Sequence, residues 1–66
     1  MSVSSVSTVT ATSPVSLQDA IERGFERAQQ TLRGIQKIEV VGERANIDRG
    51  KIKDYEVELK IIFSLE

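Results

Sequence analysis

The C-terminal segment YEVELKIIFSLE alternates between apolar and polar side chains almost without interruption. Successive side chains of a strand point to opposite faces, so this pattern predicts a long β-strand with one buried and one solvent-facing side. The apolar parity consists of Tyr55, Val57, Leu59, Ile61, Phe63 and Leu65. The other parity consists of Asp54, Glu56, Glu58, Lys60 and Ser64, interrupted by Ile62. Ile62 indicates that something covers that end of the polar face.

A helical pattern lies in the middle of the chain and predicts a helix over residues 17–33. Its apolar and small residues form one stripe: Leu17, Ala20, Ile21, Gly24, Phe25, Ala28 and Leu32. Ser16 is the expected N-cap, with Asp19 at the capping-box position near the positive end of the helix dipole. Gly34 is expected to end the helix as a left-handed residue. Gly24, on the buried stripe, is expected to permit close approach to a sheet rather than to serve a ligand.

Two more strands complete the pattern. Residues 3–11 are rich in Val, Thr and Ser and favour an edge strand that ends before Pro14. Two interpretations of its start are open: residues 1–5 are a disordered lead-in to the strand, or a disordered polar tail runs through Ser7. Residues 35–48 form the second strand, and the DRGK turn with Gly50 closes a hairpin to the last strand.

The resulting order is β-α-β-β, an α+β protomer in a single domain over residues 1–66. A right-handed crossover leaves a gap between the first two strands. The last strand fits that gap and pairs antiparallel with both, which gives a three-stranded antiparallel sheet partly wrapping one helix.

Composition excludes several function classes. The 66-residue chain has no Cys and no His, which removes disulfides and the usual zinc sites. The net charge of −1 comes without a basic block, so neither nucleic acid nor an anionic membrane is an expected partner. No segment has the length of a membrane helix and the N-terminus lacks the pattern of a signal peptide, so a cytoplasmic protein is expected. With no nucleophile–base pair or phosphate loop, the chain is not expected to be an enzyme, and neither a catalytic nor a metal site is assigned.

The lengths of the elements point to self-association. A 17-residue helix spans about 25 Å, whereas a strand of about 14 residues spans roughly 45 Å. One helix cannot cover such a hairpin. Apolar residues beyond the helix, near Tyr55 and Val57 or near Phe63 and Leu65, are therefore expected to need another subunit.

Taken together, these features resemble the dodecins, small flavin-binding proteins that assemble as hollow spherical homododecamers. The resemblance rests on the segments TSPVSLQDAI, RAQQTLRGI, IEVV and YEVELKIIFSLE in this order and spacing. It implies trimers packed into a shell of cubic symmetry and a small ligand, riboflavin or FMN, bound at subunit interfaces.

The resemblance also implies site residues, and two of them depart from the family. Flavin-binding dodecins carry a stacking tryptophan where this chain has Lys37, and a glutamine that hydrogen-bonds the flavin edge where it has Glu56. A lysine has no aromatic plane, and an ionised carboxylate accepts but does not donate. Arg44 aligns with a basic residue that meets a phosphate in some dodecins, although a solvated strand residue is an equal interpretation.

Flavin binding is therefore expected to be weak or altered, and two alternatives stay open. One is a flavin-independent shell that is structural or holds metal cations on its many carboxylates: Glu39, Glu43, Asp48, Asp54, Glu56 and Glu58. In the other, Lys37 and Glu56 form an ion pair that fills the former flavin pocket.

Overall fold

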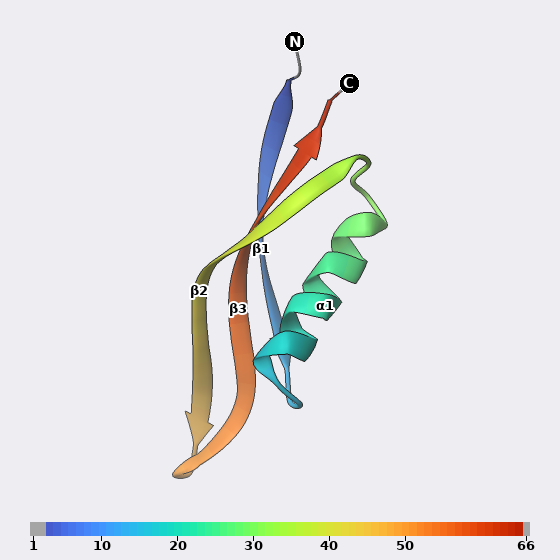
Figure 1. Cartoon of the computed structure of the whole chain (residues 1–66). Coiled ribbons are helices and arrows are strands. Elements are labelled where there is room, and N and C mark those ends of the chain that lie inside the picture. Colours follow the sequence, from blue (N-terminus) through green and yellow to red (C-terminus); the bar gives the residue numbers. More distant parts are fainter. Residues whose placement is uncertain (1–2, 66) are drawn as a thin grey trace.

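One helix packs on a three-stranded sheet in the computed structural model, which describes residues 3–65 (Figure 1). The elements in chain order are β1 (Ser4–Ser13), α1 (Leu17–Gln29), β2 (Ile35–Asp48) and β3 (Lys51–Ser64). The strand order is β1-β3-β2, and β3 pairs antiparallel with both neighbours. The predicted β-α-β-β order and the central place of the last strand are confirmed.

The first strand begins at Ser4, close to the predicted start at residue 3, and ends two residues later than the predicted end at residue 11. The backbone of β1 already pairs with β3 from Ser4. A disordered tail that runs through Ser7 is therefore wrong for the described residues. Disorder of residues 1–5 is likewise wrong at positions 4 and 5. Residues 1 and 2 lie outside the described part. At the other end β1 continues to Ser13, directly before Pro14, which cannot donate to a ladder.

The helix is shorter than predicted: α1 ends at Gln29, so the expected span of 17–33 and the role of Gly34 as its terminal residue are wrong. The amides of Thr31 and Leu32 both bond to the Ala28 carbonyl, which closes the last turn. Leu32 keeps the helical spacing in sequence but packs against the core from the connecting turn. Gly34 is left-handed (φ 68°) at the entry to β2, where its carbonyl accepts from the Ser64 amide at 2.9 Å.

A polar cluster fixes the start of the helix to the end of β1. Ser16 caps the helix as predicted, since its hydroxyl accepts from the Asp19 amide at 2.9 Å. The Asp19 carboxylate accepts from the Ser13 hydroxyl at 2.5 Å and from Arg23 at 2.6 Å. These hydrogen bonds, Ser13 first and Arg23 second, lower the pKa of Asp19. Ser13 is fully buried and also accepts from the Val15 amide.

The core is small and lies where α1 crosses β1 and β3. Its buried members are Ala20, Ala28, Val57, Leu59 and Ile61. Gly24 allows the close approach that the sequence predicted, because a Cβ built there would lie 2.6 Å from Leu59 Cδ1 and 3.3 Å from Ala11 Cβ.

The hairpin of β2 and β3 extends beyond the helix (Figure 1). Arg49 (φ 52°) and Gly50 (φ 75°) form its turn, which matches the two left-handed residues of a type I′ turn. Val57 is fully buried under the helix, so its predicted place among the uncovered residues is wrong. The uncovered apolar residues at this end are instead Ile47 and Ile52, 62% and 56% exposed.

Candidate functional site

Lys37 lies near the start of β2, directly after a register irregularity between Ile35 and Lys37. Its side chain is exposed, and among the described residues no ion pair involves it. It pairs in register with Ile62 of β3, which is 9% exposed and has Val6 of β1 on its other side. Ile62, the one apolar residue among the polar positions within 54–64 of β3, is thus flanked by a neighbouring strand on each side.

A groove runs beside Lys37 between α1 and the start of β2. Its volume is about 360 Å³, which is within the range of small-molecule sites. The lining residues are Ile21, Glu22, Phe25, Ile35, Gln36, Lys37 and Ile38. The only aromatic ring among them is that of Phe25.

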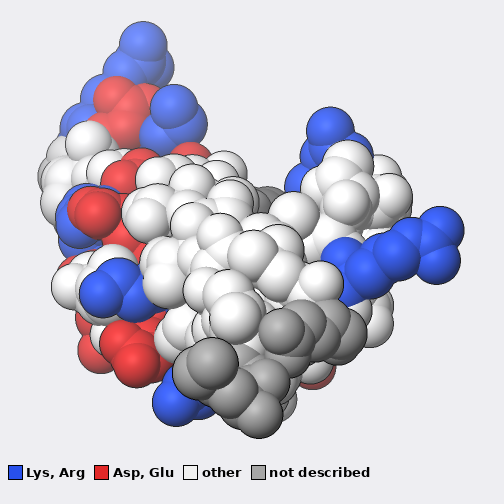
Figure 2. Space-filling view, turned by 90° about the horizontal axis from the view of Figure 1, so that it is seen from above, with Lys and Arg blue, Asp and Glu red and all other residues white. Residues whose placement is uncertain are grey.

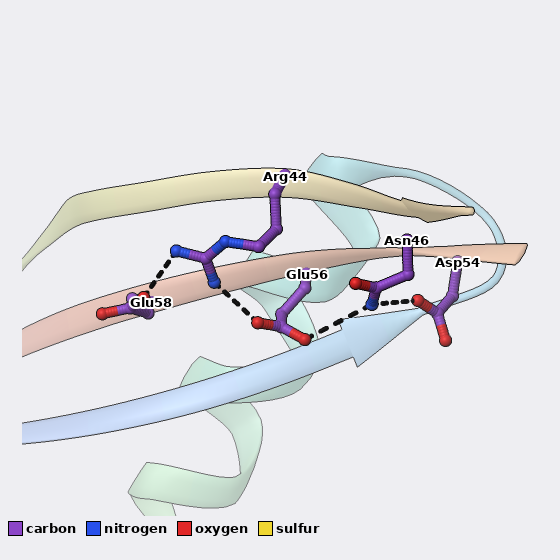
Figure 3. Close-up of polar contacts among 5 residues, drawn as sticks. All are labelled: Arg44, Asn46, Asp54, Glu56 and Glu58. Carbon is purple, nitrogen blue, oxygen red and sulfur yellow. Dashed lines mark hydrogen bonds and ion pairs between the residues drawn. The ribbon is translucent and has the colours of Figure 1, made fainter. Parts of the chain in front are cut away.

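Arg44 and Glu56 face each other on β2 and β3, within a chain of polar contacts (Figure 3). Arg44 Nη1 donates to Glu56 Oε2 at 2.6 Å, and Arg44 Nη2 donates to Glu58 Oε1 at 2.5 Å. Asn46 Nδ2 donates to Asp54 Oδ1 at 2.6 Å and to Glu56 Oε1 at 3.3 Å. We call these five residues, Arg44, Asn46, Asp54, Glu56 and Glu58, the strand network.

Two consequences follow from the strand network. The pKa of Arg44 is raised by its hydrogen bonds to Glu58 and then to Glu56, so the guanidinium stays charged. Both carboxylate oxygens of Glu56 already accept a hydrogen bond within the protomer. A Cβ at Gly42 would lie 2.9 Å from Arg44 Nη2, so this glycine leaves space for the guanidinium.

The three residues suggested by the resemblance fall into two places. Lys37 pairs with Ile62 and Glu56 pairs with Arg44, so six positions of β3, about 20 Å, separate Lys37 from Glu56. The hypothesis of an ion pair between Lys37 and Glu56 is therefore wrong within the protomer. Sequence reasoning also missed Asn46 and Gly42 as parts of the Arg44 environment.

The carboxylates do not gather into a metal cluster. Glu39 pairs in register with Lys60, whereas Glu56 pairs with Arg44. Over residues 3–65, no group of three or more Asp or Glu side chains is arranged to hold a metal ion. In the same part of the chain, the helix is too short and too polar to cross a membrane.

The fold and sequence assign the chain to a family. The family model for dodecins matches residues 3–66, and the chain belongs to the dodecin family. The structure of dodecin from Streptomyces davaonensis superimposes with a TM-score of 0.92 at 34% identity, covering 98% of this chain and 96% of that one. Dodecin from Streptomyces coelicolor gives a TM-score of 0.92 at 35% identity, with coverage of 98% and 93%.

A Thermus thermophilus dodecin in which a tryptophan is replaced by phenylalanine is also similar, with a TM-score of 0.92 at 33% identity and coverage of 100% and 98%. Comparison with curated proteins gave no match.

Proposed function

We propose that this dodecin is a homododecameric shell, built from trimers, that binds or stores a small ligand at its subunit interfaces and is not an enzyme. In this proposal its binding of flavin, as riboflavin or FMN, is weak or altered. Lys37, Glu56 and Arg44 are the residues proposed to face the ligand.

The shape of the protomer supports assembly. Its radius of gyration is 13.5 Å, whereas a compact chain of this length is expected near about 11 Å. Its accessible surface is 4779 Å² for 7.3 kDa, against about 4,200 Å² for a typical monomer.

Apolar side chains account for part of this excess surface. Val15, Val41, Ile47, Ile52 and Leu65 are all more than half exposed. In the space-filling view most acidic side chains gather on one side, next to a broad uncharged surface (Figure 2). Apolar side chains exposed in this way suit contact with other copies of the chain.

The observation that carries the ligand proposal is the engagement of Glu56. The resemblance implies that the equivalent glutamine hydrogen-bonds the flavin edge. An ionised carboxylate keeps the acceptor role of an amide but has no hydrogen to donate. Here Arg44 and Asn46 also occupy its two oxygens. A flavin edge would have to displace these contacts to be recognised.

Lys37 weakens the stacking half of the site. An aromatic pair contributes about 0.5–1.5 kcal/mol beyond the area it buries, and a lysine side chain has no ring. The resemblance implies that, in flavin-binding dodecins, tryptophans of two neighbouring subunits sandwich two flavin rings at the position of Lys37. Two copies of Lys37 would bring two positive charges together there instead.

Arg44 sets an expectation for the choice between FMN and riboflavin. Its guanidinium already donates to Glu56 and Glu58, so the FMN phosphate would compete with two carboxylates for it. We therefore propose that FMN has little or no advantage over riboflavin.

Titration of riboflavin and FMN, followed by quenching of flavin fluorescence, tests the proposal directly. The wild-type chain is expected to show weak, unsaturated quenching at micromolar protein. The double variant Lys37→Trp/Glu56→Gln is expected to bind at least about tenfold more tightly, which corresponds to about 1.4 kcal/mol.

A matched control is Lys53→Trp, which adds the same ring to an exposed lysine outside the proposed site. It should leave quenching at the wild-type level. Tight stoichiometric binding by the wild-type chain would contradict the weak-flavin proposal, and an equal gain in the control would show that any surface tryptophan suffices.

A further inference from the structure

Two register irregularities in β2 decide which side chains meet in the middle of the hairpin. One lies directly before Gly42 and the other directly after Asn46, so they bound the short segment between them. Bulges of this kind re-aim side chains and are over-represented next to active sites. Within the segment, Gly42 pairs with Glu58 and Arg44 pairs with Glu56. The two irregularities therefore bring the strand network together on one face of the hairpin (Figure 3).

Glu58 differs from the other carboxylates of the strand network in its contacts. Arg44 is the one hydrogen-bond partner that we find for the Glu58 side chain in the described part of the chain. Glu56 accepts from Asn46 as well as from Arg44, and Asp54 accepts from Asn46. The Glu58 carboxylate thus acts on the guanidinium of Arg44 alone.

Gly42 makes the contact between Arg44 and Glu58 possible. Arg44 lies opposite Glu56 in the register, and its guanidinium reaches Glu58 by passing over Gly42. A Cβ at Gly42 would lie 2.9 Å from Arg44 Nη2 and 3.4 Å from Glu58 Oε1. Gly42 does not have a positive φ. A side chain at this position would therefore displace the guanidinium without straining the backbone.

The strand network carries an excess of negative charge around one reachable guanidinium. Its one positive and three negative side chains leave a formal charge of −2. The planar fork of an arginine suits phosphate, and the Arg44 side chain is 41% exposed, so a ligand can reach it. However, each of its terminal nitrogens already donates to a carboxylate. A phosphate that approached the remaining N–H groups would meet two like charges at close range.

We propose that Glu58 is a specificity-determining residue, which withholds Arg44 from the phosphate of a phosphorylated ligand. A phosphate then gives the ligand no gain in affinity, and loss of Glu58 turns the site toward phosphate esters. The inference rests on the proposed function, in which Arg44 faces the ligand, and it adds the residue that sets the choice between neutral and phosphorylated ligands. Gly42 is a positioning residue in this arrangement, because it acts through Arg44.

The ratio of the FMN and riboflavin association constants tests the role of Glu58, because the two ligands differ by one phosphate. Flavin fluorescence quenching measures both constants in Lys37→Trp/Glu56→Gln, where Glu58 is the carboxylate that remains on Arg44. Adding Glu58→Gln is expected to raise the ratio at least about tenfold, the order of one charged hydrogen bond. Adding Arg44→Gln as well should return the ratio to that of the background. An unchanged ratio after Glu58→Gln would overturn the inference.

Two further variants separate the contact from the net charge. Gly42→Ala keeps the charge but displaces the guanidinium from Glu58, so it should also raise the ratio. Glu43→Gln is the matched control, because it removes a carboxylate next to Arg44 in sequence that pairs in register with Val57. It should leave the ratio unchanged. A gain with Glu43→Gln as large as with Glu58→Gln would show a general effect of charge and would overturn the specific role of Glu58.

Reaction of Arg44 with phenylglyoxal gives a readout that does not depend on flavin. In the otherwise wild-type chain, Glu58→Gln should speed the modification of Arg44 severalfold, as followed by peptide mass spectrometry. Inorganic phosphate should slow the reaction in this variant more than in wild type. Equal rates in the two proteins, or equal protection by phosphate, would contradict the inference. A failure of Lys37→Trp/Glu56→Gln to bind flavin would instead contradict the proposed function, so the two failures are distinguishable.

Discussion

The β2–β3 hairpin has one half near the helix and one half near its turn, and these two halves have very different surroundings. Near the helix, Val57, Leu59 and Ile61 are fully buried. Near the turn, Ile47 and Ile52 are mostly exposed, and the strand network holds the two strands together on the other face. The difference shows that packing stabilises one half within the protomer, while the other half keeps apolar surface for contacts outside it.

The largest effect is expected at the covered half. Leu59→Ala removes the central buried side chain and should lower the free energy of unfolding by about 2–5 kcal/mol. Urea unfolding followed by circular dichroism measures this change. A loss below about 1 kcal/mol would show that the covered half is not the main source of stability.

A smaller effect is expected where the helix touches the sheet. Gly24→Val places atoms where Leu59 Cδ1 now lies and should cost about 1–3 kcal/mol through overpacking. The same change in a Leu59→Ala background should cost less, because the smaller side chain leaves room. Equal costs in both backgrounds would show that the contact between Gly24 and Leu59 does not limit the site.

A pH effect is expected at Asp19, whose hydrogen bonds connect the start of the helix to the end of β1. The pKa of Asp19 is lowered by Ser13 and Arg23, so its ionised form is favoured in the folded state. The stabilisation from the ionised carboxylate is therefore complete at pH values above the pKa of Asp19 in the unfolded chain, about 3.9. It is lost as the pH falls through the lower pKa of the folded state. The urea midpoint of unfolding, measured from about pH 6 down to about pH 2, should fall less steeply in Asp19→Asn than in wild type. Parallel curves would contradict a role for this carboxylate.

The covered half was largely predictable from the sequence. Strict alternation in β3 and the helical stripe with Gly24 depend only on local periodicity, and both are present in the structure. The helix end was not predictable in this way, because Leu32 fits the same period while it packs from a turn. Periodicity identifies which residues are buried but does not show where the backbone stops being helical.

The uncovered half was less predictable because of bulges. Asp48 pairs with Lys51 next to the turn. A regular register continued from this pair would place Arg44 opposite Tyr55. The irregularity between Asn46 and Ile47 shifts the register by one, so Arg44 faces Glu56 instead. A one-residue shift changes the face of every side chain beyond it, and the strand network could not be assigned without the structure.

The smallest effect on the protomer is expected at the tip of the hairpin. Ile52→Thr keeps a β-branched residue at a 56% exposed position and should change the unfolding free energy by no more than about 0.5 kcal/mol in dilute protein. Assembly stabilises folded chains by mass action, so stability should rise with protein concentration. If the tip is buried between copies, this rise should be smaller in the variant than in wild type. Urea titrations at two protein concentrations separate the stability of the protomer from the stabilisation by assembly. If Ile52→Thr lowered the unfolding free energy as much as Leu59→Ala at both concentrations, Ile52 would belong to the protomer core.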